Sequence, residues 1–256
     1  MESTSTENKA LKVLLGQLNP VFKRKQENLS RVAKSMERYG EQDGLDLVMF
    51  PEMAFVGYNF KNREHIIDET EELGKGASFE FCIGLAKRLK SYVIFGYAEK
   101  KEAEGKTLLF NSACLLDRSG NIVVNAHKSH LYESDALWSE EGEGFKTAII
   151  TTLAGDELRC AIGICMDINP YKWHSGKNEL ADFVNSNNCE VLLFLSAWND
   201  HEPNHPNESR SQIALIEYWL HRLRPLLSDK QNKCPEKLFI VCDRVGTETT
   251  YTNNKE

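Results

Sequence analysis

Three residues with chemically useful side chains stand at the carboxyl ends of apolar runs that predict buried strands. They are Glu52, Lys128 and Cys165. A cysteine thiolate is a nucleophile, a glutamate can accept the thiol proton, and a lysine ammonium can stabilise an oxyanion. Layered α/β proteins bind their ligands at strand ends. Together the three residues can therefore supply a nucleophile, a base and an electrostatic stabiliser for attack on a carbon centre.

Each of these residues also has a plainer interpretation. Cys165 fits a core cysteine that finishes a strand, Glu52 a helix-capping or loop glutamate, and Lys128 an ordinary solvated lysine. Taken singly, Cys165 and above all Lys128 fit the plain interpretation better, and for Glu52 the two interpretations are equal. The catalytic hypothesis rests on the combination, because three complementary groups at three strand ends are harder to obtain by accident.

The elements that must position these residues are apolar strands that alternate with amphipathic helices. Strands are expected at residues 11–17, 45–50, 92–97, 108–117, 121–126, 148–152, 158–164, 191–196 and 238–241. Helices are expected at residues 23–39, 78–89, 178–187 and 209–223. Two hairpins, turning near residues 118–120 and 154–156, interrupt a pure βαβ series, and residues 199–207 read as a surface loop. The pattern predicts a mixed-sheet, layered α/β fold.

Composition narrows the classes of function. Hydrophobic residues make up 41% of the 256 and charged residues 27%, which is typical of a globular protein. We expect one domain over residues 1–256, with residues 1–10 as a flexible tail. The net charge of −7 argues against a nucleic-acid partner. No apolar run approaches the ~20 residues of a membrane helix, and the polar N-terminus lacks the layout of a signal peptide.

The cysteines indicate a reducing compartment. There are seven, an odd number, and none forms a C-x-x-C pair. This usage favours a cytoplasmic protein, with the nucleus as a second compartment, in which one thiol is free to act as a nucleophile.

The residues around the three strand ends resemble the nitrilase superfamily, also called the carbon–nitrogen hydrolases. The matching segments are Val48-Met49-Phe50-Pro51-Glu52 with Gly57-Tyr58, then Ala126-His127-Lys128-Ser129-His130-Leu131-Tyr132, then Gly163-Ile164-Cys165-Met166-Asp167, supported by residues 13–20 and 192–198. The resemblance extends over the chain from about residue 11, and order, spacing and residue type agree at all three sites.

This resemblance implies a four-layer αββα sandwich and a Glu-Lys-Cys triad. Carried over to the matching positions, Glu52 is the general base, Lys128 the oxyanion partner and Cys165 the nucleophile, and the backbone N–H of Met166 completes the oxyanion hole. The family often has a second glutamate after the lysine segment. The adjacent Glu140 and Glu141 are both candidates here, and Glu141 is slightly favoured.

No metal or organic cofactor is expected, because the triad needs none. The histidines at 201 and 205 lie near acidic residues, but Pro203 and Pro206 disfavour the helix that would bring them to one side.

Within the superfamily, the sequence is most similar to the protein N-terminal asparagine/glutamine amidase branch. The segments that carry this similarity are residues 51–60, 128–132 with 138 and 144–145, and 163–171. The branch deamidates N-terminal Asn or Gln side chains of proteins to Asp or Glu through a cysteine thioester, a step of the N-degron pathway. Protein or peptide N-termini are then the substrates.

Five further residues are candidates for substrate binding. An N-terminal amidase must recognise an ammonium group, and Asp167 is a candidate partner for it, with a capping role in the following turn as an equal alternative. The backbone of Met166 faces the oxyanion. The aromatic residues Tyr58, Tyr132 and Trp198 are candidates to line the pocket, although aromatic residues are more often part of a core.

Three other interpretations stay open. The same triad serves an ω-amidase, a carbamoylase or a nitrilase that acts on a small molecule. A non-catalytic interaction protein is a second possibility, because the family's chains usually continue into further strands after the motif at residues 243–248, whereas residues 249–256 are few and polar. A thiol redox protein is disfavoured, since a strand would hold Cys160 and Cys165 about 16 Å apart. The chain is expected to be a monomer or a homodimer.

Overall fold

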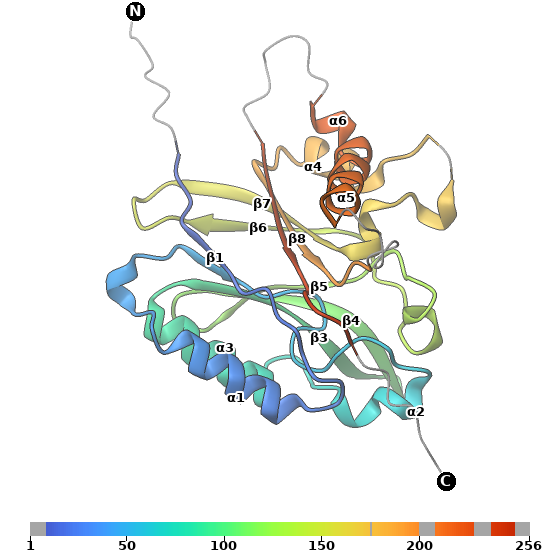
Figure 1. Ribbon diagram of the computed structural model, residues 1–256, viewed down its shortest axis with the longest axis horizontal. Helices are drawn as coiled ribbons and strands as arrows, with labels where there is room; N and C mark the ends of the chain where they lie inside the picture. Colours follow the sequence, from blue (N-terminus) through green and yellow to red (C-terminus); the bar gives the residue numbers. More distant parts are fainter. Residues whose placement is uncertain (1–8, 175, 200–207, 228–236, 249–256) are drawn as a thin grey trace, which may run out of the picture.

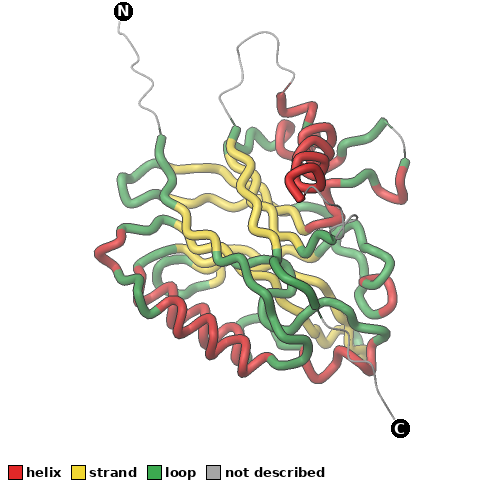
Figure 2. Tube along the Cα trace, viewed as in Figure 1, coloured by secondary structure: helices red, strands yellow, loops and turns green. Residues whose placement is uncertain are grey.

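Two β-sheets lie face to face and helices cover their outer sides in the computed structural model, which describes residues 9–174, 176–199, 208–227 and 237–248 (Figures 1 and 2). The first sheet has the order β1-β2-β3-β4-β5. Its strands are β1 (Val13–Leu15), β2 (Leu47–Met49), β3 (Tyr92–Ala103), β4 (Lys106–Leu116) and β5 (Ile122–His127). The second sheet has the order β6-β7-β8-β9. Its strands are β6 (Lys146–Thr151), β7 (Glu157–Ile164), β8 (Val191–Ser196) and β9 (Leu238–Asp243).

The helices form the two outer layers of the sandwich (Figure 1). Helices α1 (Lys25–Met36) and α3 (Ala77–Leu89) cover the first sheet, while α4 (Glu179–Ser186), α5 (Glu208–Arg222) and α6 (Arg224–Leu227) lie over the second. Helix α1 buries Leu29, Val32 and Met36, which recur at the period of one helix face. The short helix α2 (Arg63–Ile66) and five 3₁₀ turns complete the described elements, the turns being η1 (Glu41–Asp43), η2 (Ile67–Glu69), η3 (Asp135–Leu137), η4 (Cys165–Ile168) and η5 (Tyr171–Trp173). The predicted αββα sandwich is confirmed.

The central core fills the space between the sheets with apolar side chains. Met49 and Ile94 point inward from the first sheet, and Ile150, Ile162 and Leu193 point inward from the second, all almost without exposure. Burial of this kind contributes roughly 25 cal/mol per Å² of apolar surface. Because such cores are close-packed, the two sheets hold one fixed relative position.

Strand direction brings the carboxyl ends of several strands to common edges. In the first sheet β2 is parallel to β3, β3 is antiparallel to β4, and β4 is antiparallel to β5, so β2 and β5 run the same way. In the second sheet β7, β8 and β9 are parallel. Glu52 and Lys128, which follow β2 and β5, therefore emerge at one edge, and Cys165 follows β7 at the carboxyl edge of the second sheet.

The strands and helices predicted from the sequence are confirmed, although β1 and β2 are shorter than predicted and β3 is longer. Strand β3 continues to Ala103 and pairs with β4 through a two-residue turn, in which Glu104 and Gly105 both have left-handed φ values. Residues 99–102 are charged, so no apolar run indicates this part of the strand. Of the predicted loop 199–207, residues 200–207 lie outside the described part of the chain.

A glycine on β3 allows the backbone that carries Glu52 to approach the sheet closely. A Cβ on Gly96 would lie 2.6 Å from the Cα of Glu52 and 2.7 Å from the carbonyl oxygen of Pro51. The two segments are also joined by a hydrogen bond from the Gly96 N–H to that carbonyl oxygen, at 3.1 Å. Both neighbouring atoms belong to the backbone, so neither can rotate away.

Gly96→Ala should lower the free energy of unfolding by about 1–3 kcal/mol, the usual cost of overpacking. The matched control is Gly84→Ala in helix α3, where an added Cβ meets no atom within 4 Å. This control should raise the free energy of unfolding by up to ~1 kcal/mol, because alanine is the better helix former. Urea unfolding of both variants measures the two values, and equal effects would contradict the close approach at Gly96.

Candidate active site

The three predicted catalytic residues meet where the edges of the two sheets face each other. The Nζ atom of Lys128 lies 2.6 Å from Oε1 of Glu52, and the charges of both residues act on the thiol of Cys165. Oε2 of Glu52 accepts a hydrogen bond of 2.9 Å from the backbone N–H of Ala197, just after β8. Glu52 thus connects the carboxyl end of a strand in one sheet to the carboxyl end of a strand in the other.

Glu52 is completely buried and fully hydrogen-bonded. Besides Lys128 and Ala197, the side-chain amide of Asn111 on β4 donates to Oε1 at 2.8 Å. Burial raises the pKa of Glu52, although the ammonium of Lys128 opposes this shift. A glutamate with a raised pKa is suited to accepting and returning a proton near neutral pH.

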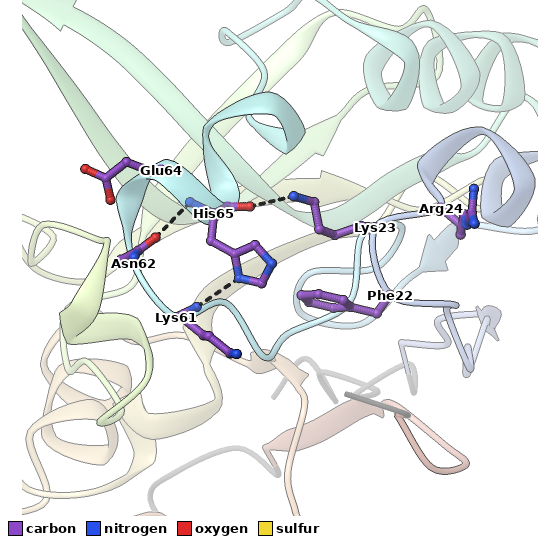
Figure 3. A pocket seen from close by; sticks show the side chains of 7 residues that line it. All are labelled: Phe22, Lys23, Arg24, Lys61, Asn62, Glu64 and His65. Carbon is purple, nitrogen blue, oxygen red and sulfur yellow. Dashed lines mark hydrogen bonds between the residues drawn. The ribbon is translucent and has the colours of Figure 1, made fainter. Parts of the chain in front are cut away.

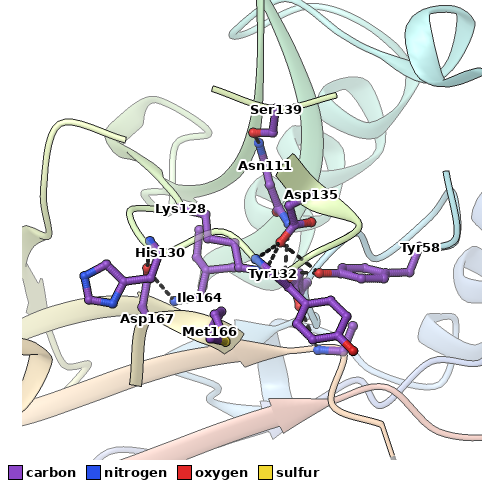
Figure 4. Close-up of polar contacts among 12 residues, drawn as sticks. Tyr58, Asn111, Lys128, His130, Tyr132, Asp135, Ser139, Ile164, Met166 and Asp167 are labelled. Atoms are coloured by element: carbon purple, nitrogen blue, oxygen red, sulfur yellow. Dashed lines mark hydrogen bonds and ion pairs between the residues drawn. The ribbon is translucent and has the colours of Figure 1, made fainter. Parts of the chain in front are cut away.

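Lys128 is also fully buried, and each of its three N–H donors has a partner (Figure 4). Nζ contacts Oδ2 of Asp135 at 2.5 Å, Oε1 of Glu52 at 2.6 Å and the hydroxyl oxygen of Tyr58 at 3.1 Å. Burial alone would lower the pKa of Lys128, but the carboxylates of Asp135 and Glu52 outweigh it and hold the pKa well above its ordinary value. The ammonium is therefore a permanent charge in the site.

The carboxylates that contact Lys128 are those of Asp135 and Glu52, whereas Glu141, the residue predicted to position the lysine, contacts Tyr171. Glu141 is exposed and accepts a hydrogen bond from the hydroxyl of Tyr171 at 2.9 Å. Glu140 is exposed as well and lies 3.4 Å from Arg63. Asp135 is buried in the turn η3, seven residues after the lysine.

Asp135 is held by hydrogen bonds of its own. Oδ2 accepts from the Tyr58 hydroxyl at 2.9 Å and from the Tyr132 N–H at 3.0 Å, and Oδ1 accepts from Asn111 at 3.2 Å. The sequence contains no signal that separates Asp135 from the neighbouring Glu133, which is exposed. Only the direction of a short turn decides which of the two carboxylates is buried.

Cys165 lies at a sharp turn between β7 and η4. Its φ of 44° is left-handed, a conformation that costs energy in a residue other than glycine and that often occurs at functional sites. As the second residue of the 3₁₀ turn, Met166 has an N–H without an acceptor inside the turn, beside the thiol. Burial, and after it the negative charge of Glu52, raise the pKa of the Cys165 thiol well above its ordinary value. The resting thiol is therefore protonated.

The carboxylate of Asp167 is buried and accepts hydrogen bonds from the backbone. Oδ1 accepts from the backbone N–H groups of Ser129 at 2.9 Å and His130 at 2.8 Å, and Oδ2 accepts from the Ile164 N–H at 2.9 Å (Figure 4). Both oxygens are thus engaged by the backbone, which favours the capping interpretation over ammonium binding. Asp167 also ties the segment after Lys128 to the turn that carries Cys165.

A cavity of about 160 Å³ opens beside the thiol. The predicted residues Tyr58, Tyr132, Met166 and Trp198 line it together with Cys165. Four further residues line the cavity and were not predicted as binding residues from the sequence, namely Asn169, Trp173, Ala197 and Asn199. Trp173 lies in a polar turn without apolar periodicity, so nothing in the sequence except its aromatic side chain indicated a place in the pocket.

A larger cavity, of about 620 Å³, lies near the start of α1 (Figure 3). It is lined by Phe22, Lys23, Arg24, Lys61, Asn62, Glu64 and His65. It holds none of the triad, so the smaller cavity is the candidate active site.

Within the described residues, no cluster of His, Cys, Asp or Glu could hold a metal ion, and no helix is long and apolar enough to cross a membrane. The histidines at 201 and 205 lie outside the described part.

Comparisons with known proteins agree with this geometry. Residues 12–208 match the family model described as "Carbon-nitrogen hydrolase". The protein N-terminal amidase of Schizosaccharomyces pombe is 29% identical over 248 residues, which cover 91% of this chain and 84% of that protein. The protein N-terminal amidase of Saccharomyces cerevisiae is 30% identical over 208 residues, which cover 74% of this chain and 45% of that protein.

A crystal structure of N-terminal amidase with an Asn-Glu-Ala peptide is similar in fold. Its TM-score is 0.69 at 27% identity, and the match covers 86% of this chain and 55% of that chain. The chain thus spans about half the length of this structure and of the budding-yeast relative.

Asp135→Asn should reduce kcat/KM for amide hydrolysis by about tenfold or more, because it removes one of the two charges that hold the Lys128 ammonium. The negative charge of Asp135 also raises the pKa of Glu52. Its removal should move the acid limb of the kcat/KM profile to lower pH, which a purely structural defect would not do. Glu141→Gln is the matched control and should change kcat/KM less than twofold. A larger loss of kcat/KM in Glu141→Gln than in Asp135→Asn would show that Glu141 is the positioning residue.

Alkylation of Cys165 by iodoacetamide should be slow at pH 7 and should accelerate as the pH rises, since only the thiolate reacts. Glu52→Gln removes a charge that raises the pKa of the thiol, so the rate at pH 7–8 should increase. Mass spectrometry of the labelled peptide measures this rate. An unchanged rate in Glu52→Gln would show that the carboxylate does not act on the thiol, and a slower rate would show that it acts as the base for the thiol proton and not through its charge.

Proposed function

The chain belongs to the carbon–nitrogen hydrolase family, and we propose that it is a protein N-terminal amidase, which converts an N-terminal Asn or Gln to Asp or Glu with release of ammonia. The observation that carries this proposal is the small cavity with Cys165 in its wall and the buried Glu52–Lys128–Asp135 cluster behind it. Its volume of about 160 Å³ lies well below the roughly 300–1,000 Å³ of pockets for larger ligands. It suits a single amide side chain.

In the proposed mechanism, the sulfur of Cys165 attacks the side-chain amide carbon while Glu52 takes the thiol proton. The C–N bond then breaks, Glu52 returns the proton to the leaving ammonia, and a thioester remains. Water, deprotonated by Glu52, attacks the thioester and releases the acid and the free thiol. Each step uses the same base, whose raised pKa suits it to both directions of proton transfer.

Lys128 and the Met166 N–H are the proposed donors to the oxyanion. In the resting site all three N–H groups of Lys128 are engaged. Protonation of Glu52 removes the charge that attracts one of them, so this N–H becomes available at the moment the oxyanion forms. Loss of one oxyanion donor typically lowers kcat about 100-fold or more.

The proposed substrate class is supported by the relatives of this chain. The two yeast relatives are named protein N-terminal amidase, and one similar structure contains an Asn-Glu-Ala peptide. The proposal therefore takes protein or peptide N-termini as substrates, in the N-degron pathway. A cytoplasmic or nuclear location belongs to the same proposal, and the six cysteines in the described residues are all free, as a reducing compartment favours.

The proposal is tested with four peptides of otherwise equal sequence, which begin with Asn, Gln, Ala or Nα-acetylated Asn. We expect ammonia release and the amide-to-acid mass change only with free-amine Asn or Gln, and none in Cys165→Ala. Mass spectrometry and an ammonia assay measure the two products. If small ω-amides are hydrolysed and the peptides are not, the triad assignment stands and the substrate is a small molecule, as in the alternative interpretation. A folded protein without any turnover would favour a non-catalytic role.

A further inference from the structure

One tryptophan is exposed at the mouth of the catalytic cavity. Trp173 lines the cavity and is 64% exposed, whereas Trp138 and Trp219 are buried and Trp198 is half-buried. An indole in water leaves a large apolar surface uncovered, and tryptophan is enriched at sites that contact ligands. Trp173 lines the cavity and belongs to none of the buried apolar clusters.

The backbone that presents this side chain is in an unfavourable conformation. Lys172 and Trp173 have φ values of 48° and 58°, which residues other than glycine rarely adopt. The turn is held by several contacts. The N–H of Trp173 donates to the carbonyl oxygen of Pro170 at 3.0 Å, and the hydroxyl of Tyr171 donates to Glu141 at 2.9 Å. Strain that is fixed by its surroundings in this way is concentrated at functional sites.

The size of the cavity determines which part of a substrate reaches Trp173. About 160 Å³ accommodates one side chain against Cys165, so the rest of a peptide must leave through the mouth. The first peptide bond and the second residue are the groups that follow the amide side chain outward. Among the aromatic residues that line the cavity, Trp173 is the most exposed, and a flat apolar ring contacts varied side chains without requiring one sequence.

We propose that Trp173 forms a second subsite, in which its indole contacts the second residue of the substrate and so selects peptides over free asparagine or glutamine. The inference rests on the proposed N-terminal amidase function and extends it to a specificity-determining residue. Trp173 takes no part in the chemical steps at Cys165.

The test measures binding, so that it does not depend on turnover. Calorimetry in the Cys165→Ala background compares asparagine amide with an Asn-Ala dipeptide amide, which differ by the second residue. Trp173→Ala should weaken dipeptide binding about tenfold, which corresponds to about 1.4 kcal/mol, and should change asparagine amide binding less than twofold. Trp173→Phe should restore most of the loss, because it keeps an aromatic ring. Leu153→Ala, which removes a 56% exposed side chain that does not line the cavity, should change neither value.

Three results would overturn the proposal. These are an equal loss for both ligands in Trp173→Ala, no loss for either ligand, and no preference for the dipeptide when Trp173 is present. Failure of the amidase function has a different signature. In that case the wild-type protein would leave Asn peptides unchanged, while the Cys165→Ala protein would still bind the dipeptide more tightly in a Trp173-dependent way.

Discussion

The buried ammonium of Lys128 is the interaction on which the site depends. Removing a charge from water costs several kcal/mol even in a relaxed protein, and this cost is offset only by close opposite charges with their hydrogen bonds satisfied. Asp135 and Glu52 supply those charges at 2.5 Å and 2.6 Å. Asn111 donates to both carboxylates and keeps them on either side of the lysine. The turn η3 and the ends of β2 and β5 are therefore constrained together by one buried charge.

The relative position of the two sheets is the second constraint, because the site is divided between them. Two sets of hydrogen bonds cross from one to the other. Glu52 accepts from Ala197, and Asp167 accepts from Ser129 and His130. Neither could form if the sheets slid by one residue along their strands. The close-packed apolar core between the sheets thus sets the distance between the base and the nucleophile, and Gly96 allows the base to approach the first sheet.

The sequence predicted the strands and helices because they follow from the period of apolar residues, and it placed Glu52, Lys128 and Cys165 at strand ends that the structure brings together. A buried strand reads as an apolar run, and the residue after it reads as a candidate for the edge of the sheet, as with Glu52 and Cys165. The positioning carboxylate could not be found in this way. Asp135 and Glu133 differ only in the side of a short turn that each occupies, and that side is fixed by contacts to Tyr58 and Asn111, which are distant in sequence. Asp167 was ambiguous for the same reason, since its three backbone donors come from two segments.

In the proposed mechanism, the charge balance of the site lets a buried thiol with a raised pKa act as a nucleophile. The resting cluster contains two carboxylates and one ammonium, so an additional thiolate would place a second net negative charge in a buried site. Transfer of the thiol proton to Glu52 forms a thiolate but removes a carboxylate charge, and the buried net charge stays constant. The desolvation cost of a new ion is thereby avoided. In the proposed attack by the sulfur, the negative charge passes to the substrate oxygen, and the N–H of Lys128 that the protonated Glu52 releases is the proposed donor to this oxygen.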